Sequence, residues 1–246
     1  MNSNFSIIIP ALNEDIFLPR LLESIASQHF LSELEVIVVD GESTDNTRGV
    51  ALTFKQSIPQ LSVITTHNGL SHQRNFGASK AKYDYLLFID ADSVLPREFL
   101  AHLSKQIGQA TDIIALPLIL PYKGSVNDYI FTLSAYVFFM LTRFTGPIVT
   151  GMCIVTSKTA HQRMGGFDEK VVYGEDIEYG LRSFRQGAKY HIYLNSYLFG
   201  STRRGHEIGR LKLGCTWLQW YFDILHHGPI TDRSKYDYKY GNNTKS

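Results

Sequence analysis

The sequence predicts an α/β fold in which a mostly parallel sheet is flanked by helices, built as one continuous domain with a C-terminal helical extension. The length of 246 residues suits one large domain, and 44% hydrophobic with 19% charged residues is typical of a globular chain. Short runs rich in β-branched residues alternate with segments of helical periodicity. Strands that alternate with helices form parallel sheets through right-handed crossovers.

The first half of the chain contains four strand–helix units. Each predicted strand is a short apolar run that a proline or a turn residue ends, and these runs span residues 6–10, 35–40, 61–65 and 85–90. Apolar residues at helical spacing predict helices over 18–26 and 71–81. Ser43, Thr44 and Asp45 offer N-caps for a helix that follows the second predicted strand. Pro96 suits the first turn of a helix that follows the fourth predicted strand.

The second half is less regular. The apolar stretch 129–142 is shorter than the roughly 20 residues that a bilayer span needs, so we expect a buried helix, with a helix in the membrane interface as the alternative. Ile177, Leu181 and Phe184 give a further helix that ends near Gly187, and 190–194 is strand-like.

Charge and cysteine content narrow the functional classes. With 24 Lys+Arg against 23 Asp+Glu, nucleic-acid binding by bulk electrostatics is not expected. Cys153 and Cys215 cannot build a disulfide framework, which suits a cytoplasmic protein. Residues 200–246 nevertheless carry eight Lys/Arg and four acids, which favours contact with phosphates or with anionic lipid at the inner face of a membrane.

Acidic and amide side chains follow three of the predicted strands. In a parallel sheet the carboxyl ends of the strands meet in one crevice, so these side chains should lie close together: Asn13, Glu14, Asp40, Asp90 and Asp92. Their charges repel unless a cation lies between them. Mn²⁺ or Mg²⁺ held by Asp90 and Asp92, with substrate phosphates completing its shell, is the simplest solution. The alternative is that both aspartates only cap the helix at Pro96.

A second acidic pair opens the predicted helix over 175–187. Glu175 and Asp176 lie in its first turn, where the helix dipole favours negative charge, and this alone explains them. The functional alternative makes Asp176 a general base that takes a proton from a hydroxyl group. The spacing does not decide between these two interpretations.

Five motifs in this order resemble glycosyltransferase family 2. They are Ser6-Ile-Ile-Ile-Pro10-Ala-Leu-Asn13-Glu14, Val38-Val39-Asp40 with Ser43-Thr44-Asp45-Asn-Thr47, Arg74-Asn75-Phe-Gly77, Asp90-Ala-Asp92 and Gly174-Glu175-Asp176. The resemblance covers about residues 4–204 and is closest to small, soluble bacterial members. It implies the GT-A, Rossmann-like fold and inverting transfer from a nucleotide sugar. No Gln-x-x-Arg-Trp motif of processive synthases occurs.

The resemblance also implies a role for each matching residue. Pro10, Asn13 and Glu14 resemble the loop that frames the nucleoside, Asp40 the acid that binds base or ribose, and Arg74 the basic residue near the nucleotide. Asp90 and Asp92 resemble the Asp-x-Asp pair, with Asp92 the more direct metal ligand, and Asp176 resembles the catalytic base. The donor-sugar and acceptor pocket is implied for Thr150, Gly151 and Glu175.

Three later residues resemble parts of a variant pattern. Arg203 and Arg204 are similar to paired arginines that hold the diphosphate or a phosphorylated acceptor, and the alternative is a solvated basic pair. His206 resembles a late third metal ligand, and the alternative is an ordinary hydrogen-bonded histidine.

The predicted function is therefore metal-dependent transfer of a hexose from a UDP- or GDP-linked sugar to a hydroxyl acceptor, which the apolar stretch and basic C-terminus suggest is lipid-linked. We expect a transferase domain over 1–204, with a nucleotide and metal half (1–95) and an acceptor half (96–204), and a basic extension over 205–246. The enzymatic alternative is a haloacid-dehalogenase-like phosphatase, because Asp90-x-Asp92-x-Val94 fits its nucleophile pattern. A non-catalytic sugar-nucleotide-binding module is the other alternative.

Overall fold

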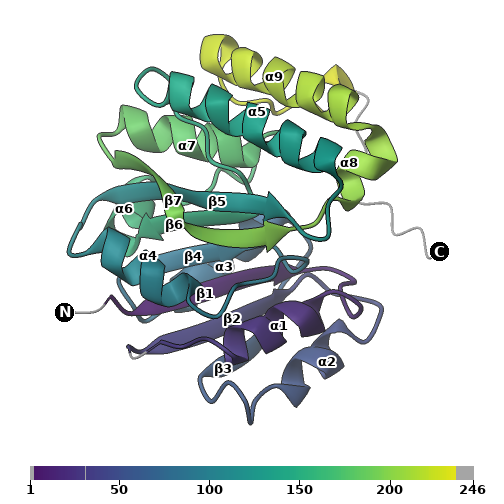
Figure 1. Cartoon of the computed structure of the whole chain (residues 1–246), viewed down its shortest axis with the longest axis vertical. Coiled ribbons are helices and arrows are strands. Elements are labelled where there is room, and N and C mark those ends of the chain that lie inside the picture. Colours follow the sequence, from purple (N-terminus) through teal and green to yellow (C-terminus); the bar gives the residue numbers. More distant parts are fainter. Residues whose placement is uncertain (1–2, 31, 237–246) are drawn as a thin grey trace.

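Seven strands form one mixed sheet in the computed structural model, which describes residues 3–30 and 32–236 (Figure 1). The order across the sheet is β3-β2-β1-β4-β6-β5-β7. Neighbours pair in parallel except for β6, which is antiparallel to β4 and to β5, so the expectation of a mostly parallel sheet is confirmed. The strands are β1 (Phe5–Ala11), β2 (Leu34–Asp40), β3 (Leu61–Thr65), β4 (Tyr85–Ile89), β5 (Ile113–Pro121), β6 (Cys153–Ser157) and β7 (Lys189–Gly200).

Helices cover both faces of this sheet, and the strands alternate their side chains between two apolar layers. Ile7 and Ile9 of β1 pack into one layer, whereas Ile8 packs into the other. Because the central strands are buried on both faces, they read as continuous apolar runs in the sequence. The helices are α1 (Leu18–Ala26), α2 (Thr47–Thr53), α3 (Leu70–Lys80), α4 (Phe99–Ile107), α5 (Val126–Thr142), α6 (Lys158–Arg163), α7 (Glu175–Arg185), α8 (Arg203–Ile208), α9 (Arg210–His227) and the 3₁₀ turn η1 (Arg233–Lys235).

Two predicted helix starts are wrong. The N-cap of α2 is Asn46, which makes no capping bond, whereas the Asp45 carboxylate accepts the Thr47 N–H at 2.9 Å. Helix α4 begins at Phe99 with Glu98 at its N-cap, three residues later than Pro96 suggested. Asp90 and Asp92 therefore do not cap α4, which removes that alternative for the pair.

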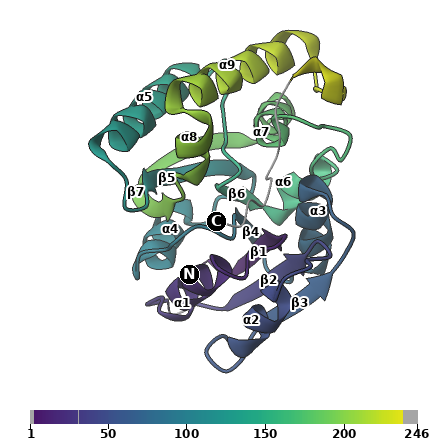
Figure 2. The ribbon, with the colours of Figure 1, turned by 90° about the vertical axis from the view of Figure 1, so that its right-hand side faces the viewer.

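The expectation that the apolar stretch 129–142 is a buried helix is also wrong. Of helix α5, only Asp128, Tyr136 and Phe139 are buried, while Leu133 and Leu141 are 67% and 74% exposed. The helix packs on the sheet by one edge and on α9 by another, and the rest of it meets solvent (Figures 1 and 2). Among residues 3–30 and 32–236, no helix combines the length and the hydropathy needed to cross a bilayer.

Part of the predicted basic C-terminal segment lies outside the described residues. This part is 237–246, and it includes Lys239, Lys245 and Asp237, which contribute to the predicted charge.

Candidate functional site

The carboxyl ends of the parallel strands meet at one edge of the sheet, the edge that Figure 2 turns toward the viewer. Asn13 and Glu14 follow β1, Asp40 ends β2, and Asp90 and Asp92 follow β4. Since β2, β1 and β4 are adjacent in the sheet, the structure brings these five predicted site residues to one place. Pro10 lies at the same end of β1, beyond Ile8, the last residue of β1 that pairs with β4, and it still pairs with Val39 of β2.

The loops after β1 and β2 are bonded to each other. Asn13 adopts a left-handed backbone conformation (φ 55°), which short amide side chains tolerate, and its Oδ1 accepts the Thr44 N–H at 2.8 Å. The Asn13 N–H donates to Ser43 Oγ at 2.9 Å, and the Glu14 N–H donates to Thr47 Oγ1 at 2.8 Å. These bonds explain why the run of small polar residues around Ser43 serves the neighbouring loop and not a helix cap.

Helix α3 is held unusually close to β1 and β2. A Cβ added at Gly77 would lie 2.5 Å from Ile8 Cγ2, so only glycine permits this approach. One turn earlier, the Gln73 amide donates to the carbonyl oxygens of Ala11 and Val39, at 3.0 and 2.8 Å. The helix therefore presents Arg74 at the carboxyl edge of the sheet.

Arg74 is 1% exposed and joins three separate segments. Its Nη2 donates to Asp90 Oδ1 at 3.1 Å and to the Gly151 carbonyl at 3.1 Å. Its Nη1 donates to Glu175 Oε1 at 3.2 Å. The guanidinium lies over the Phe167 ring at 5.2 Å from the centroid, and such stacking holds it in one orientation.

Gly151 connects Arg74 to Asp176. The Gly151 N–H donates to Asp176 Oδ2 at 2.6 Å, and a Cβ at this position would lie 2.8 Å from Arg74 Nη2. Thr150 precedes it, and the buried Thr150 Oγ1 has no hydrogen-bond partner among the described residues. Buried hydroxyl groups without a partner are rare, which marks Thr150 as a candidate site residue.

Three carboxyl groups of this site have raised pKa values. Burial raises the pKa of Glu14 to about 7, with the Asp92 charge as a second cause. Burial outweighs the nearby Arg74 and raises the pKa of Asp90 to about 6. The pKa of Asp176 is raised to about 7 by burial and then by Glu175. Perturbed pKa values of this kind cluster at functional sites.

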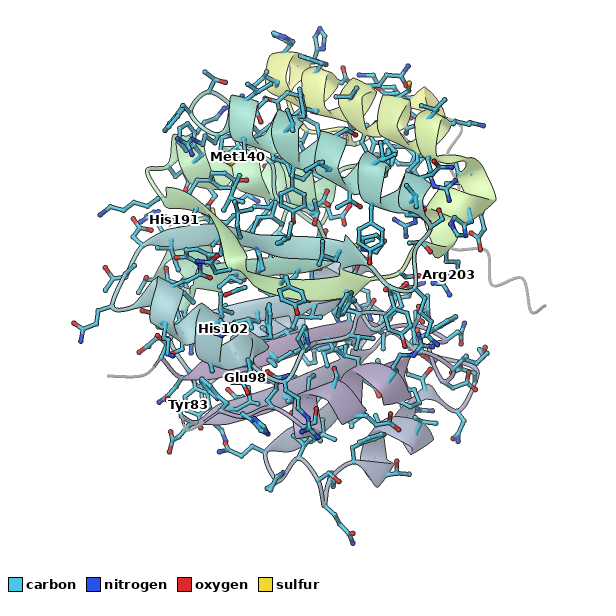
Figure 3. All side chains as sticks on the ribbon, viewed as in Figure 1. Tyr83, Glu98, His102, Met140, His191 and Arg203 are labelled. Atoms are coloured by element: carbon cyan, nitrogen blue, oxygen red, sulfur yellow. The ribbon has the colours of Figure 1, made fainter. Side chains whose placement is uncertain are left out.

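Helix α8 brings Arg203 to the acidic cluster. Arg203 Nη2 lies 3.6 Å from Asp92 Oδ2 and 3.8 Å from Glu14 Oε1, and its guanidinium stacks on Phe17 at 4.6 Å. Figure 3 shows Arg203 at the carboxyl edge of the sheet. The charge of Arg204 lowers the pKa of Asp90, so it acts on the same cluster.

The His206 side chain contacts Asp128 and Arg210, not the acidic cluster. Its Nε2 lies 3.2 Å from Asp128 Oδ1 and 2.9 Å from Arg210 Nη2, so the structure does not bring this ring together with Asp90 and Asp92. A role as third metal ligand would require α8 to turn, and it stays a prediction.

The chemistry of the cluster fits a divalent cation. Asp90, Asp92 and Glu14 offer only carboxylate oxygens, which Mg²⁺ and Mn²⁺ prefer, and the buried Glu14 Oε2 has no hydrogen-bond partner among the described residues. Within residues 3–30 and 32–236, the group that places three ligand atoms within 4.8 Å of one another is made by His67, His72 and Glu169, and not by these carboxylates. There, however, both nitrogens of His72 already bond to Thr66 and Glu169, and the two imidazoles stack.

Three residues of the site were not predicted. Gln73 bonds to the ends of two strands, Phe167 supports Arg74, and Phe17 supports Arg203. Gln73 was open to prediction because it directly precedes Arg74 in the expected helix. Nothing in the local sequence marks the two phenylalanines, since their role depends on which arginine the fold places over each ring.

Comparison with known proteins identifies the family. Residues 6–164 match the model of the family described as "Glycosyl transferase family 2". The chain is 38% identical over 108 residues to the PGL/p-HBAD biosynthesis glycosyltransferase of Mycobacterium bovis (strain BCG / Pasteur 1173P2), which is 43% of this chain and 42% of that protein. It is 33% identical over 99 residues to the poly(ribitol-phosphate) beta-N-acetylglucosaminyltransferase TarS of Staphylococcus aureus (strain Mu50), which is 39% of this chain and 17% of that protein. The matched segment thus spans less than half the length of these curated relatives.

Solved structures share the fold. The mannosyltransferase PcManGT from Pyrobaculum calidifontis in complex with GDP-Man and Mn²⁺ superimposes with a TM-score of 0.70 at 20% identity, covering 92% of this chain and 71% of that one. At such identity the likeness establishes the fold alone, which is GT-A-like as expected. The family match extends over more than half of the residues and includes the Asp90-Ala-Asp92 and Arg74 motifs. The chain therefore belongs to glycosyl transferase family 2.

Proposed function

We propose that this protein transfers a hexose from a UDP- or GDP-linked sugar to a hydroxyl acceptor, with inversion and with the help of Mn²⁺ or Mg²⁺. The observation that carries the proposal is the convergence of Glu14, Asp90 and Asp92 at the carboxyl edge of the sheet, with Asp176 held beside them through Arg74 and Gly151. Relatives support it: structures similar in fold bind UDP-GlcNAc in TarS and GDP-Man with Mn²⁺ in PcManGT.

The acceptor belongs, in our proposal, to the synthesis of a cell-envelope glycan or glycolipid. TarS is named for transfer to poly(ribitol-phosphate), and a Bacillus subtilis relative, 24% identical over 199 residues, is a minor teichoic acid biosynthesis protein. These names apply to proteins much longer than this chain, so they support an acceptor class and not one acceptor.

The donor would lie along the edge formed by β2, β1 and β4. Pro10, Asn13, Glu14 and Asp40 would frame the nucleoside. Asp92 and Asp90 would hold the metal ion, which when bound neutralises charge on the diphosphate. Arg203 and Arg204 would then be released from the carboxylates to contact the phosphate oxygens. The sugar would be lined by Thr150, Gly151 and Glu175.

Asp176 is the proposed general base. A pKa of about 7 leaves a substantial ionised fraction at neutral pH and still gives the carboxylate a strong tendency to accept a proton. The Gly151 N–H fixes Asp176 Oδ2, and the N–H of Ile177 donates to Oδ1 at 2.8 Å, so the group is oriented before substrate binds. It would take the proton of the acceptor hydroxyl as that oxygen attacks the anomeric carbon and the nucleotide departs from the opposite face.

We propose a matching division of the chain. Residues 1–95 supply the nucleotide and metal site, 96–204 supply the acceptor side, and 205–246 form the extension. Arg203 stands at the boundary between the last two parts.

Titration calorimetry of UDP- and GDP-sugars tests donor binding. One nucleotide sugar should bind in the presence of Mn²⁺, and EDTA should abolish binding. Asp92→Asn should lose metal-dependent binding, whereas Asp112→Asn, which changes an exposed pair with Arg163, should bind normally. Normal metal-dependent binding by Asp92→Asn would refute the assigned metal site.

Hydrolysis of the bound donor, followed as nucleotide release, tests catalysis. Wild-type protein should hydrolyse the sugar slowly without an acceptor, and Asp176→Asn should bind the donor with unchanged affinity but lose this activity. An unchanged rate in Asp176→Asn would remove Asp176 as the base, and no turnover by the wild type with any acceptor would favour the non-catalytic binding module. The phosphatase alternative has no support from the family match, and a failure to trap an aspartyl-phosphate would close it.

A further inference from the structure

Helix α5 exposes a continuous apolar stripe. Its exposed apolar residues recur at alternating intervals of four and three, which in a helix places them along one face. They are Val126, Ile130, Leu133, Val137 and Met140, and Phe144 continues the series just past the helix end. Leu141 widens the stripe. A long unpartnered stripe of this kind normally marks an interaction surface.

Helix α9 carries a second stripe beside the first. Leu211, Leu218 and Phe222 are exposed at the same periodicity, with Leu211 86% exposed. The two helices pack through Phe131 against Trp217 and through Phe138 against Tyr221. Figures 1 and 2 both show α5 and α9 side by side. We call the exposed apolar residues of these helices, with Phe144, the α5/α9 face.

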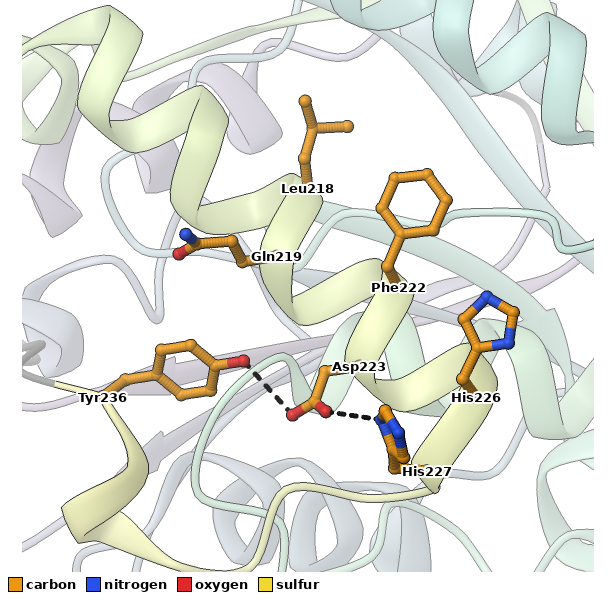
Figure 4. A pocket seen from close by; sticks show the side chains of 7 residues that line it. All are labelled: Leu218, Gln219, Phe222, Asp223, His226, His227 and Tyr236. Atoms are coloured by element: carbon orange, nitrogen blue, oxygen red, sulfur yellow. Dashed lines mark hydrogen bonds and ion pairs between the residues drawn. The ribbon is translucent and has the colours of Figure 1, made fainter.

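The acidic group of each helix is paired with a basic side chain, although Asp223 lines the same pocket as Leu218 and Phe222. Asp128, the only acid of α5, is buried and accepts from Arg210 Nε at 2.6 Å. Asp223, the only acid of α9, pairs with Lys235 at 2.5 Å and with His227 at 2.9 Å. Figure 4 shows Leu218 and Phe222 projecting from another side of α9 than Asp223, which points to Tyr236 and His227.

Exposed cations flank the α5/α9 face, although the exposed acid Glu207 of α8 lies four residues before Leu211. Lys123 precedes α5, Arg143 directly follows it, and Lys212 lies in the first turn of α9; all three are exposed. Exposed apolar residues flanked by Lys and Arg, on helices that expose no acid of their own, are typical of helices that lie in the interface of an anionic bilayer.

We propose that the α5/α9 face binds the surface of a membrane that contains anionic lipid. A second copy of the chain suits this face less well, because two cationic borders would meet with no exposed acid of α5 or α9 opposite them. Insertion across the bilayer is excluded for the described helices by their length and hydropathy. The helices would instead lie flat, with leucine and phenylalanine side chains among the acyl chains and Lys/Arg at the phosphates.

This docking has a consequence for the site. Helix α8, which carries Arg203 to Asp92, ends where α9 begins, at one end of the α5/α9 face. A protein bound by this face would hold its acceptor side near the lipid headgroups and reach a hydroxyl acceptor anchored in the membrane. That consequence rests on the proposed function, whereas lipid binding itself does not.

Vesicle flotation of the full chain tests the proposal. The wild type should float with phosphatidylcholine vesicles that contain phosphatidylglycerol, bind neutral phosphatidylcholine vesicles roughly tenfold more weakly, and lose the difference at high salt. The variant Leu133→Ser/Leu211→Ser should bind anionic vesicles at least about tenfold more weakly than the wild type. Leu52→Ser, a matched change on α2 at the opposite end of the molecule, should bind like the wild type.

Two results would overturn the proposal. In the first, the wild type binds anionic and neutral vesicles equally at low salt, or binds neither. This test needs no variant. The other is a dimer by light scattering that Leu133→Ser/Leu211→Ser converts to monomer without any change in flotation, since the face would then join two copies. Calorimetry of the donor nucleotide on the same variants separates this outcome from a failure of the proposed function, because the α5/α9 face is not part of the donor site.

Discussion

Arg74→Met tests whether the acidic site depends on one buried cation. The guanidinium of Arg74 bonds to Asp90, Glu175 and the Gly151 carbonyl, and it is almost fully buried. Methionine preserves most of the side-chain length and the contact with Phe167, but it removes the charge. Asp90 and Glu175 are then left without the cation that holds them together.

The expected loss of stability is large and depends on pH. Removing one partner of a buried ion pair costs about 3–5 kcal/mol. The pKa of Asp90 is already raised to about 6 because burial outweighs Arg74, so without Arg74 it rises further. The folded variant then binds protons more readily than the folded wild type, while the unfolded chains behave alike. The loss of stability caused by Arg74→Met should therefore be largest well above pH 6. It should shrink as the pH falls through the raised pKa of Asp90, by about 1.4 kcal/mol for each unit by which the loss of Arg74 raises that pKa.

Urea unfolding at pH 8 and pH 5, followed by circular dichroism, measures the deficit. Arg163→Met is the matched control, because Arg163 makes a bidentate pair with Asp112 at 2.8 and 2.9 Å in an exposed position. That variant should lose at most about 1 kcal/mol, equally at both pH values. If Arg74→Met loses no more than Arg163→Met at pH 8, or the same amount at pH 5 and pH 8, Arg74 does not hold the carboxylates as the geometry indicates.

Three further predictions concern Gly151, Asp176 and Gly77. Gly151→Ala should lower kcat/KM by roughly 10- to 100-fold with little change in fold, because the new Cβ would lie 2.8 Å from Arg74 Nη2 and displace Arg74 and Asp176. A wild-type kcat/KM for this variant in steady-state kinetics would contradict this. The pH profile of kcat/KM should fall on the acid side of about pH 7, tenfold for each unit, because Asp176 must lose its proton to act as base; a flat profile across neutral pH would exclude this assignment. Gly77→Ala should cost about 1–3 kcal/mol in thermal or urea unfolding because its Cβ meets Ile8 at 2.5 Å, whereas Gly205→Ala, whose nearest atom would be Arg210 Cγ at 3.8 Å, should be close to neutral.

Most of the predicted elements agree with the structure where the pattern is local. The apolar β-branched runs became β1, β2 and β4, and the helix expected over 71–81 is α3 at Leu70–Lys80. The predicted starts of α2 and α4 were wrong because residues that could cap a helix also have other hydrogen-bond partners. The polar groups near Ser43 bond to the loop after β1 instead. A turn after Pro96 likewise delays α4 to Phe99.

The sequence by itself determined the order of strands and helices, and with it the meeting of Glu14, Asp40, Asp90 and Asp92, because parallel strands must bring their carboxyl ends to one edge. Only the tertiary structure decided what neutralises that edge, since Arg74 and Glu175 lie 101 residues apart and become partners through packing alone. It also decided that α5 is exposed. Hydrophobicity is a property of the residue, whereas burial depends on which surfaces the rest of the fold leaves to cover it.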